Sequence, residues 1–431
     1  MDARSSFIVD VLRAEFGELM AADPYAFERK FRKMAGNAFA FYRGSACLFY
    51  ADVHGQDDPY LDERTSRVWI HGDLHAENFG TYMNAAGQLV FNVNDFDEAY
   101  VGPFTWDLKR FAASIALIGY GKALSDEDIS VLVRRFAAAY LREIRVIAAK
   151  GDDAIGELTL ANTDGPLKRV LQEARLNTRT AMLDRQTTID DYDRRFSVFE
   201  GVYEVDDATR SRVLDAFYDC LATMPSDYVL RPTSIEVKDV VLRKGVGIGS
   251  AGLPSYNLLL EGNSQALEND VVLYMKQGQV PAVSRVVTDS AVASYFAHQG
   301  QRTAESQRAL QAHADPWLGY ATLDGIGQVV AEVSPYASDL DWTELDDMGD
   351  IGLVVGSLGA AVARMHAVAD DESSHTLVDY STEEAIAAAV GEDDKGFAEM
   401  LVEFAHGYGV RARTDHQLFV DVFRNGQLPL R

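Results

Sequence analysis

The chain has few cysteines and few basic residues for its length. Only Cys47 and Cys220 occur among 431 residues, far apart and without metal-ligand spacing. This excludes a disulfide framework and favours a reducing compartment. There are 40 Lys and Arg residues against 66 Asp and Glu, for a net charge of −26. Such a field repels nucleic acid and anionic membranes, so we expect neither as a partner, whereas a cationic small molecule would be attracted. The simpler interpretation is that the acidity keeps the protein soluble.

Long apolar runs, internal repeats and low-complexity linkers are also missing. The first twenty residues, MDARSSFIVDVLRAEFGELM, carry acidic residues throughout, which is typical of an amphipathic helix rather than a signal peptide. No apolar run reaches the ~18–20 residues that a membrane span needs. We therefore expect a cytoplasmic protein.

The periodicity of the apolar residues predicts an α+β protein in which a β-rich segment interrupts two helical regions. A capping box at Ser125–Asp128 precedes a helical stripe, and Ile351–Val368 is strongly helical, whereas Phe39–Val53 is partly strand-like. The strands are predicted at Val237–Arg243, Ser255–Gly262, Asp270–Gln277, Gly319–Asp324 and Gln328–Val333, with a helical pattern at Asp289–Ala312. We expect three parts: residues 1–230, mainly helical; 231–335, β-rich; and 336–431, helical again.

Two acidic clusters follow short apolar strands. The first is HGDLHAEN, residues 71–78, and the second is NDFDE, residues 94–98. Mg²⁺ prefers a few carboxylate or amide oxygens and keeps water or phosphate oxygens for its other positions. Asn78 and Asp95 suit that task, and Asp73 is placed to accept the proton of a substrate hydroxyl, as in phosphoryl transfer. Asp97 is a further acid that could hold a second Mg²⁺ or only stabilise the loop.

A glycine-rich stretch, KGVGIGSAG, lies between two predicted strands. Gly245, Gly247, Gly249 and Ser250 would let backbone N–H groups approach phosphate oxygens. A dinucleotide-binding motif of this kind opens into a helix, whereas here a strand follows, which favours a hairpin that covers the phosphates of ATP. Lys276 ends a later apolar strand and is placed to hold those phosphates. Its expected partner is Glu305, although Glu305 could instead pair with a nearby arginine on its own helix.

Three further residues are predicted to support the acidic clusters. Asp107 begins a helix, where its carboxylate could accept N–H groups of the catalytic loop or serve only as a helix-start acid. His71 and His75 flank Asp73 and are expected to hold the loop in shape.

These motifs resemble an uncharacterised bacterial family, domain of unknown function 2252. The resemblance rests on FAFYRGSA, HGDLHAENFG, NDFDEAYVGPFTWDLKRFAAS, KGVGIGSAG and HQGQRTAESQRALQ. It implies a bilobal protein-kinase-like fold with a small antiparallel β lobe and a larger helical lobe. HGDLHAEN is similar to the catalytic loop of aminoglycoside and choline phosphotransferases, which implies Asp73 as catalytic residue and Asn78 and Asp95 as metal ligands. Asp107 is similar to a structural aspartate beyond the metal-binding motif.

The order of the motifs differs from that of ordinary kinases, because the loop containing Asp73 precedes Lys276. This order implies a circularly permuted kinase fold, with the helix ending ARMH (residues 363–366) in the place that normally leads into the catalytic loop. Two local departures are Gln277, where the family pattern implies an acid, and Gly407–Val410, where it implies a Tyr-Ala-Asp type of motif.

The expected function is therefore ATP- and Mg²⁺-dependent phosphoryl transfer to a small acceptor. Transfer of AMP, or activation of a carboxylate for ligation, would use the same nucleotide site and stays open. A metal-dependent hydrolase with His71, Asp73 and His75 as ligands is a different class, and it would leave the glycine hairpin and Lys276 unexplained. A nucleotide-binding pseudoenzyme is a further alternative.

Overall fold

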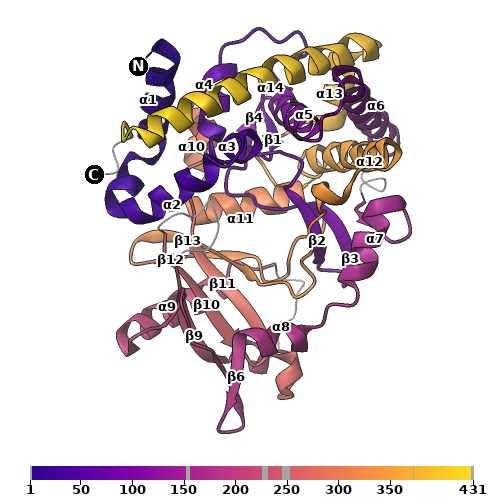
Figure 1. Ribbon diagram of the computed structural model, residues 1–431. Coiled ribbons are helices and arrows are strands. Elements are labelled where there is room, and N and C mark those ends of the chain that lie inside the picture. Colours follow the sequence, from indigo (N-terminus) through magenta and orange to yellow (C-terminus); the bar gives the residue numbers. More distant parts are fainter. Residues whose placement is uncertain (1, 152–155, 226–231, 245–252, 372, 429–431) are drawn as a thin grey trace.

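The computed structural model describes residues 2–151, 156–225, 232–244, 253–371 and 373–428. These residues form a mixed α+β structure in which a mainly helical lobe sits above a lobe built on one antiparallel sheet (Figure 1). The helix α11 (Gln299–Leu310) lies between the two lobes and contacts strands of both.

The sheet lobe contains six antiparallel strands in the order β12-β13-β11-β10-β9-β8. Alternate residues face opposite sides of the sheet, as the strand period requires. Leu273 and Met275 pack under α9, whereas Val272 and Tyr274 face α8 and α11. Lys276 continues the second set and therefore points toward the helical lobe. The elements are β8 (Val202–Glu204), β9 (Val237–Arg243), β10 (Ser255–Leu260), β11 (Val271–Gln277), β12 (Gly319–Leu323), β13 (Ile326–Glu332), α8 (Arg179–Gln186), α9 (Asp207–Leu221) and the hairpin of β6 (Thr187–Asp190) and β7 (Asp193–Phe196). The short helix α10 (Ser290–Tyr295) packs instead on the core of the helical lobe.

The helical lobe is organised around one large apolar core. Within it α12 packs along α6, and a Cβ atom added at Gly359 would lie 2.6 Å from the carbonyl oxygen of Phe136. Of its two small sheets, β2–β3–β5 lies at the edge that faces the sheet lobe, whereas β1–β4 lies among the helices (Figure 1). The elements are α1 (Ala3–Ala22), α2 (Pro24–Met34), α3 (Ala38–Gly44), α4 (Ala46–Val53), α5 (Phe104–Gly121), α6 (Asp126–Lys150), α7 (Gly165–Ala174), α12 (Met348–Ala367), α13 (Thr382–Val390), α14 (Asp394–Arg424), β1 (Val68–Ile70), β2 (Phe79–Met83), β3 (Leu89–Val93), β4 (Tyr100–Gly102) and β5 (Leu158–Thr159).

Three details differ from the sequence prediction. Residues 39–53 are helical rather than strand-like, because α3 and α4 bury their aromatic residues against the core from all sides. The helical pattern at 289–312 is divided into α10 and α11. The large sheet includes β8 and is covered by α9, so the sheet lobe takes in residues before the boundary expected at residue 231.

Among the described residues, α12 alone is long and apolar enough to cross a membrane by length and composition. It does not form one apolar run in the sequence, because it is rich in glycine and alanine and carries an acid near one end and an arginine near the other. Its buried face packs against α6, α7 and α13, which is the environment of a core helix.

An arginine near the amino terminus joins three helices. Arg4 on α1 donates to Asp52 on α4 at 2.7 Å and 2.6 Å, and to Asp415 on α14 at 2.9 Å and 2.5 Å. The side chains of Asp52 and Asp415 are only 5% and 3% exposed. Removing the guanidinium would leave two buried carboxylates without their main cation, which is strongly destabilising.

We therefore predict that Arg4→Met lowers the free energy of unfolding by about 3 kcal/mol, measured by urea denaturation. Arg13→Met on the same helix is the control, because the Arg13 side chain is 55% exposed and its ion pair with Asp10 is long, at 3.8 Å. Its change should stay within about 0.5 kcal/mol. Equal stability of the two variants would show that Arg4 does not stabilise the helical lobe.

Candidate functional site

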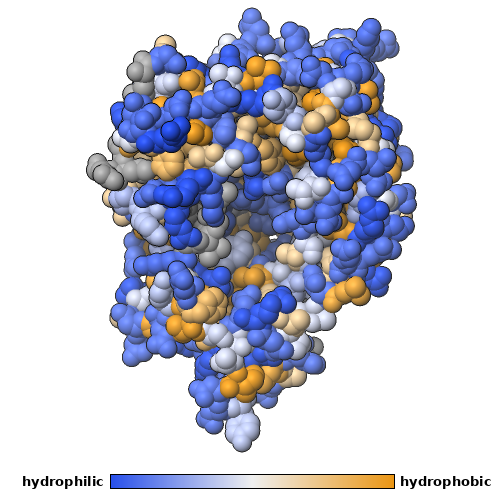
Figure 2. Space-filling view, viewed as in Figure 1, coloured by the Kyte–Doolittle hydropathy of each residue, from blue (hydrophilic) through white to orange (hydrophobic). Residues whose placement is uncertain are grey.

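A cleft of about 750 Å³ separates the two lobes, and Figure 2 shows the surface hollowed between them. Small-molecule sites typically measure ~300–1,000 Å³. The helical lobe lines the cleft with Asn78, Asp95 and Asp97, and the sheet lobe lines it with Tyr274 and Lys276. The Lys276 ammonium lies 2.9 Å from Asp97 Oδ2, although the two residues are 179 positions apart in the chain. The acidic clusters and the lysine strand therefore face one cavity.

The loop that carries Asp73 is fixed through its backbone. Asp107, in the first turn of α5, accepts the N–H groups of His71 at 2.6 Å and Gly72 at 3.0 Å. The carboxylate is fully buried, and Oδ2, the oxygen that accepts the His71 N–H, also lies 3.3 Å from His366 Nε2. Gly72 has φ +78°, and a Cβ there would lie 2.0 Å from the carbonyl oxygen of Glu98. The contact expected of Asp107 is thus present, and only glycine fits beside it.

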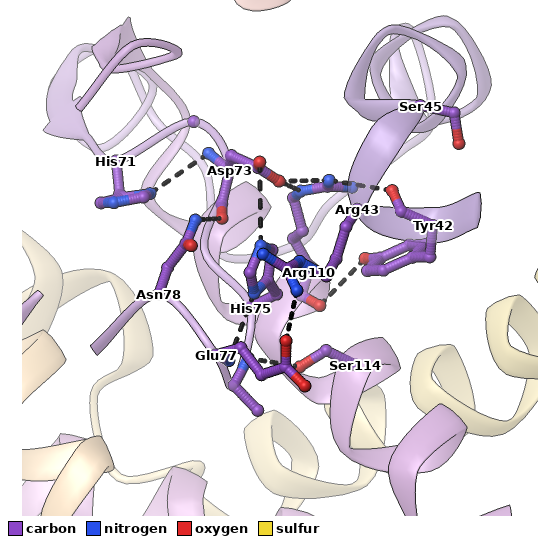
Figure 3. Close-up of polar contacts among 12 residues, drawn as sticks. Tyr42, Arg43, Ser45, His71, Asp73, His75, Glu77, Asn78, Arg110 and Ser114 are labelled. Atoms are coloured by element: carbon purple, nitrogen blue, oxygen red, sulfur yellow. Dashed lines mark hydrogen bonds and ion pairs between the residues drawn. The ribbon is translucent and has the colours of Figure 1, made fainter. Parts of the chain in front are cut away.

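The carboxylate of Asp73 is oriented by Arg110, which lies one turn after Asp107 on α5. Arg110 Nε donates to Asp73 Oδ1 at 2.8 Å, and Nη2 donates to the same oxygen (Figure 3). This guanidinium is fully buried and stacks 4.4 Å from the ring centroid of Tyr42. His75 Nε2 lies 3.9 Å from Asp73 Oδ2, and burial, with the nearby arginines, lowers the pKa of His75 well below its usual value. A neutral imidazole therefore flanks the oxygen of Asp73 that Arg110 leaves open.

Three oxygen-bearing side chains next to Asp73 could hold a divalent cation. Asn78 Nδ2 donates to the backbone carbonyl of Asp73 at 2.8 Å, which leaves the amide oxygen of Asn78 available (Figure 3). Asp95 has φ +60° and opens into the cleft without a hydrogen bond or ion pair to another described residue. Asp95 loses part of its hydration between the lobes, and this loss, together with the charge of Asp97, raises the pKa of Asp95. Asp97 Oδ1 is buried without a hydrogen-bond partner. Two close carboxylates with one orphaned oxygen fit a cation such as Mg²⁺.

Lys276 and Glu305 are not brought together. Burial disfavours the Lys276 ammonium, but the charges of Asp97, Tyr274 and Asp95 outweigh that effect and raise its pKa. Glu305 instead accepts from Arg308 at 3.1 Å, one turn along α11. The expected Lys276–Glu305 pair is therefore incorrect, because the β11 side chain reaches across the cleft to the acidic loop rather than to α11.

The predicted phosphate-binding residues of the glycine-rich stretch lie outside the described residues. These are Gly245, Gly247, Gly249 and Ser250. The strands on either side of them, β9 and β10, are paired antiparallel from Arg243 and Ser255 onward, with Ser255 lining the cleft.

Arg302, which was not among the predicted site residues, holds the second acidic loop. Its guanidinium is buried and donates to the carbonyl oxygens of Phe96 at 3.0 Å, Ala99 at 2.8 Å, Asp97 at 2.7 Å and Gln279 at 2.9 Å. Burial lowers its pKa to about 10. Arg302 stands within HQGQRTAESQRALQ, but an arginine that binds backbone carbonyls leaves no local sign in the sequence that distinguishes it from a surface arginine.

The arrangement of the histidines bears on the metallohydrolase alternative. His71 Nδ1 accepts from the N–H of Asp73 at 3.3 Å, and Nε2 contacts the carbonyl of Asn94 at 2.7 Å. Both ring nitrogens are therefore occupied within the protein. In the part of the chain that the structure describes, no three His, Cys, Asp or Glu side chains gather as a metal-binding group. His71 supports the loop rather than offering a ligand.

We predict that Arg302→Lys loosens the acidic loop, because one ammonium cannot replace four donors of a planar fork. Two lost hydrogen bonds at about 1 kcal/mol each would raise local opening roughly thirtyfold. Hydrogen exchange at residues 96–99 should accelerate by at least tenfold, while exchange in β10 stays unchanged as the internal control. Unaltered exchange at 96–99 would contradict the role assigned to Arg302.

Comparison with known proteins gives a family but no characterised relative. No curated protein and no solved structure is significantly similar to this chain. A family model described as "Uncharacterized protein conserved in bacteria (DUF2252)" matches residues 22–422. Since this match covers almost the whole chain, including both acidic loops, Lys276 and α11, the protein belongs to the DUF2252 family.

Proposed function

We propose that this protein is an ATP- and Mg²⁺-dependent phosphotransferase that acts on a small-molecule acceptor. The observation that carries the proposal is the pairing of Lys276 with Asp97 across a cleft that Asn78 and Asp95 also line. To bind a nucleoside triphosphate with its metal, a site needs an acidic loop that holds the cation and a basic side chain on the opposite wall that holds the phosphates. Asp73 lies beside them, with one oxygen fixed by Arg110.

The same contacts support a circularly permuted, kinase-like arrangement. His366, in the last turn of α12, contacts Asp107, which in turn holds the backbone of the Asp73 loop. The end of α12 therefore lies beside the beginning of that loop, although almost three hundred residues separate them in the chain. In the proposed arrangement these two segments are the ones that an ordinary kinase joins directly.

Each group has one part in the proposed reaction. Lys276 and the strands β9 and β10 would bind the phosphates of ATP, and Asn78, Asp95 and Asp97 would bind the metal. Mg²⁺ would neutralise charge on the phosphates when bound. Asp73 would orient the acceptor and accept its proton, a contribution of typically 10²–10⁴ in rate. Arg110 keeps the Asp73 carboxylate in place for that step.

The nucleotide site alone is compatible with transfer of phosphate or of AMP, and the first experiment distinguishes them. The protein is incubated with labelled ATP, Mg²⁺ and a metabolite extract, and the products are identified by mass. We expect ADP and an acceptor heavier by one phosphate. AMP-modified acceptor, or an acyl-adenylate, would replace the proposal with the alternative chemistry. Failure to bind Mg²⁺–ATP at all would refute it.

We predict that Asp95→Ala and Asp73→Ala have different consequences. Asp95→Ala should abolish Mg²⁺–ATP turnover and the Mg²⁺-dependent part of ATP binding, because a metal ligand is lost. Asp73→Ala should slow transfer by roughly 10²–10⁴ while ATP affinity stays within about threefold. Calorimetric titration and single-turnover rates measure the two quantities. Equal loss of ATP affinity in both variants would contradict this division of roles.

We also predict that Lys276→Met makes stability dependent on Mg²⁺. The substitution removes the ammonium that lies 2.9 Å from Asp97 Oδ2 and leaves Asp95 and Asp97 facing each other. Added Mg²⁺, without nucleotide, should raise the melting temperature of the variant more than that of the wild type. The control is Lys395→Met at an exposed position of α14, and its response should equal that of the wild type. A variant indifferent to Mg²⁺ would argue against a cation site there.

A further inference from the structure

A second, smaller cavity opens directly behind the proposed catalytic aspartate. It measures about 80 Å³ and lies between the amino-terminal helices and the two acidic loops. Arg43, Asp95 and Asp97 line both this pocket and the large cleft, so the two cavities meet at the acidic loop. Asp73 and Lys30 line the pocket as well. Its size accommodates a compact group of a few non-hydrogen atoms rather than a nucleotide.

Most charged side chains around this pocket already have partners. Glu15 accepts from Arg285, and Arg43 pairs with Glu77. Asp73 is held by Arg110, and Asp97 is held by Lys276. Glu98 accepts the N–H of Ala282 at 2.6 Å. Glu15, Asp73 and Asp97 are therefore each paired with a cation within the protein. Glu98 accepts a neutral N–H, and Asp95 has no partner among the described residues.

Lys30 on α2 is different. It is only 5% exposed, and it makes no hydrogen bond or ion pair with any residue that the structure describes. Its ammonium lies 4.0 Å from the ring centroid of Phe16, which also lines the pocket. Burial lowers the pKa of Lys30, and the groups that act through space in the opposite direction are Cys47, Glu98, Glu15 and Asp73, which are all pocket residues. A ring face compensates only part of the hydration that a buried ammonium loses, whereas an oxyanion would compensate more.

We infer that this pocket binds the acceptor, and that the acceptor is a compact hydroxylated molecule with a carboxylate or phosphate group that Lys30 holds. The inference rests on the phosphotransferase function proposed above and adds the substrate class. It departs from the cationic acceptor that the net charge favoured, because the overall field acts at long range, whereas Lys30 is an unpaired basic side chain among the described residues that line the pocket. The anionic group at Lys30 would direct the acceptor hydroxyl toward Asp73.

The transfer that this placement allows is balanced. The acceptor hydroxyl oxygen forms a bond to the γ-phosphorus of ATP, and the bond from that phosphorus to the β–γ bridging oxygen breaks. ADP leaves with that bridging oxygen. The hydroxyl proton passes to Asp73 Oδ2. This oxygen faces His75, and Arg110 donates to the other one, Oδ1.

Four probes test the charge preference of the pocket: D-glycerate, glycerol 3-phosphate, glycerol and ethanolamine. Binding is measured by calorimetry with and without Mg²⁺ and a non-hydrolysable ATP analogue, and ADP formation is measured with ATP. We expect one or both anionic probes to bind and to stimulate ADP formation, and glycerol and ethanolamine to do neither. The two anions distinguish a carboxylate from a phosphate ligand.

Lys30→Met tests the residue, since methionine has nearly the same length and suits the aromatic surroundings. Its KM for the anionic probe should rise at least tenfold, while ATP-analogue affinity and melting temperature remain near the wild-type values. Lys395→Met is the matched surface control. Unchanged anion affinity in Lys30→Met, preference for glycerol or ethanolamine, or binding of neither anion would overturn the inference. If the wild type does not bind the ATP analogue, the proposed function is refuted instead. Anion binding measured without nucleotide then still tests whether the pocket binds an anion.

Discussion

The ion pair between Lys276 and Asp97 is the contact on which the site depends, because it joins the two lobes across their cleft. The charge of Asp97 disfavours the charged form of Asp95, and Asp97 keeps one buried oxygen without a partner. Such an arrangement is unfavourable unless positive charge lies nearby. The ammonium supplies one such charge from the sheet lobe. The same imbalance makes the loop a natural place for a second cation.

Side chains of α5 and α11 hold the backbones of the two acidic loops in position, and a side chain of α12 supports the first of them. Asp107 on α5 accepts two N–H groups of the Asp73 loop, and Arg302 on α11 donates to carbonyl groups of the Asp97 loop. His366 on α12 completes the contact with Asp107. Because the bonds of Asp107 and Arg302 go to main-chain atoms, they fix the path of each loop and leave the functional side chains free to face the cleft.

The sequence predicted five of the six strands of the large sheet, β9 to β13, because short apolar runs bounded by turn residues give a local signal. The register of β11 places Lys276 on the same face as Tyr274, and Asp107 stands at a helix start. Long-range partners could not be predicted in the same way. Nothing near Arg302 or Glu305 shows which of them turns toward the acidic loop, and Arg110 resembles any helical arginine. The helical state of residues 39–53 was missed because an aromatic run buried on all sides has no clear period.

The proposed permutation is physically reasonable because the contacts that build the site do not depend on where the chain begins. The segment that would connect α12 to the Asp73 loop is replaced, in effect, by noncovalent contact: His366 meets Asp107, and Asp107 holds the loop. Opening the chain there frees an amino-terminal region, and in this protein that region forms α1 to α4, which wall the pocket behind Asp73. In this proposal, the helices that precede the Asp73 loop in the chain are therefore the ones that would recognise the acceptor.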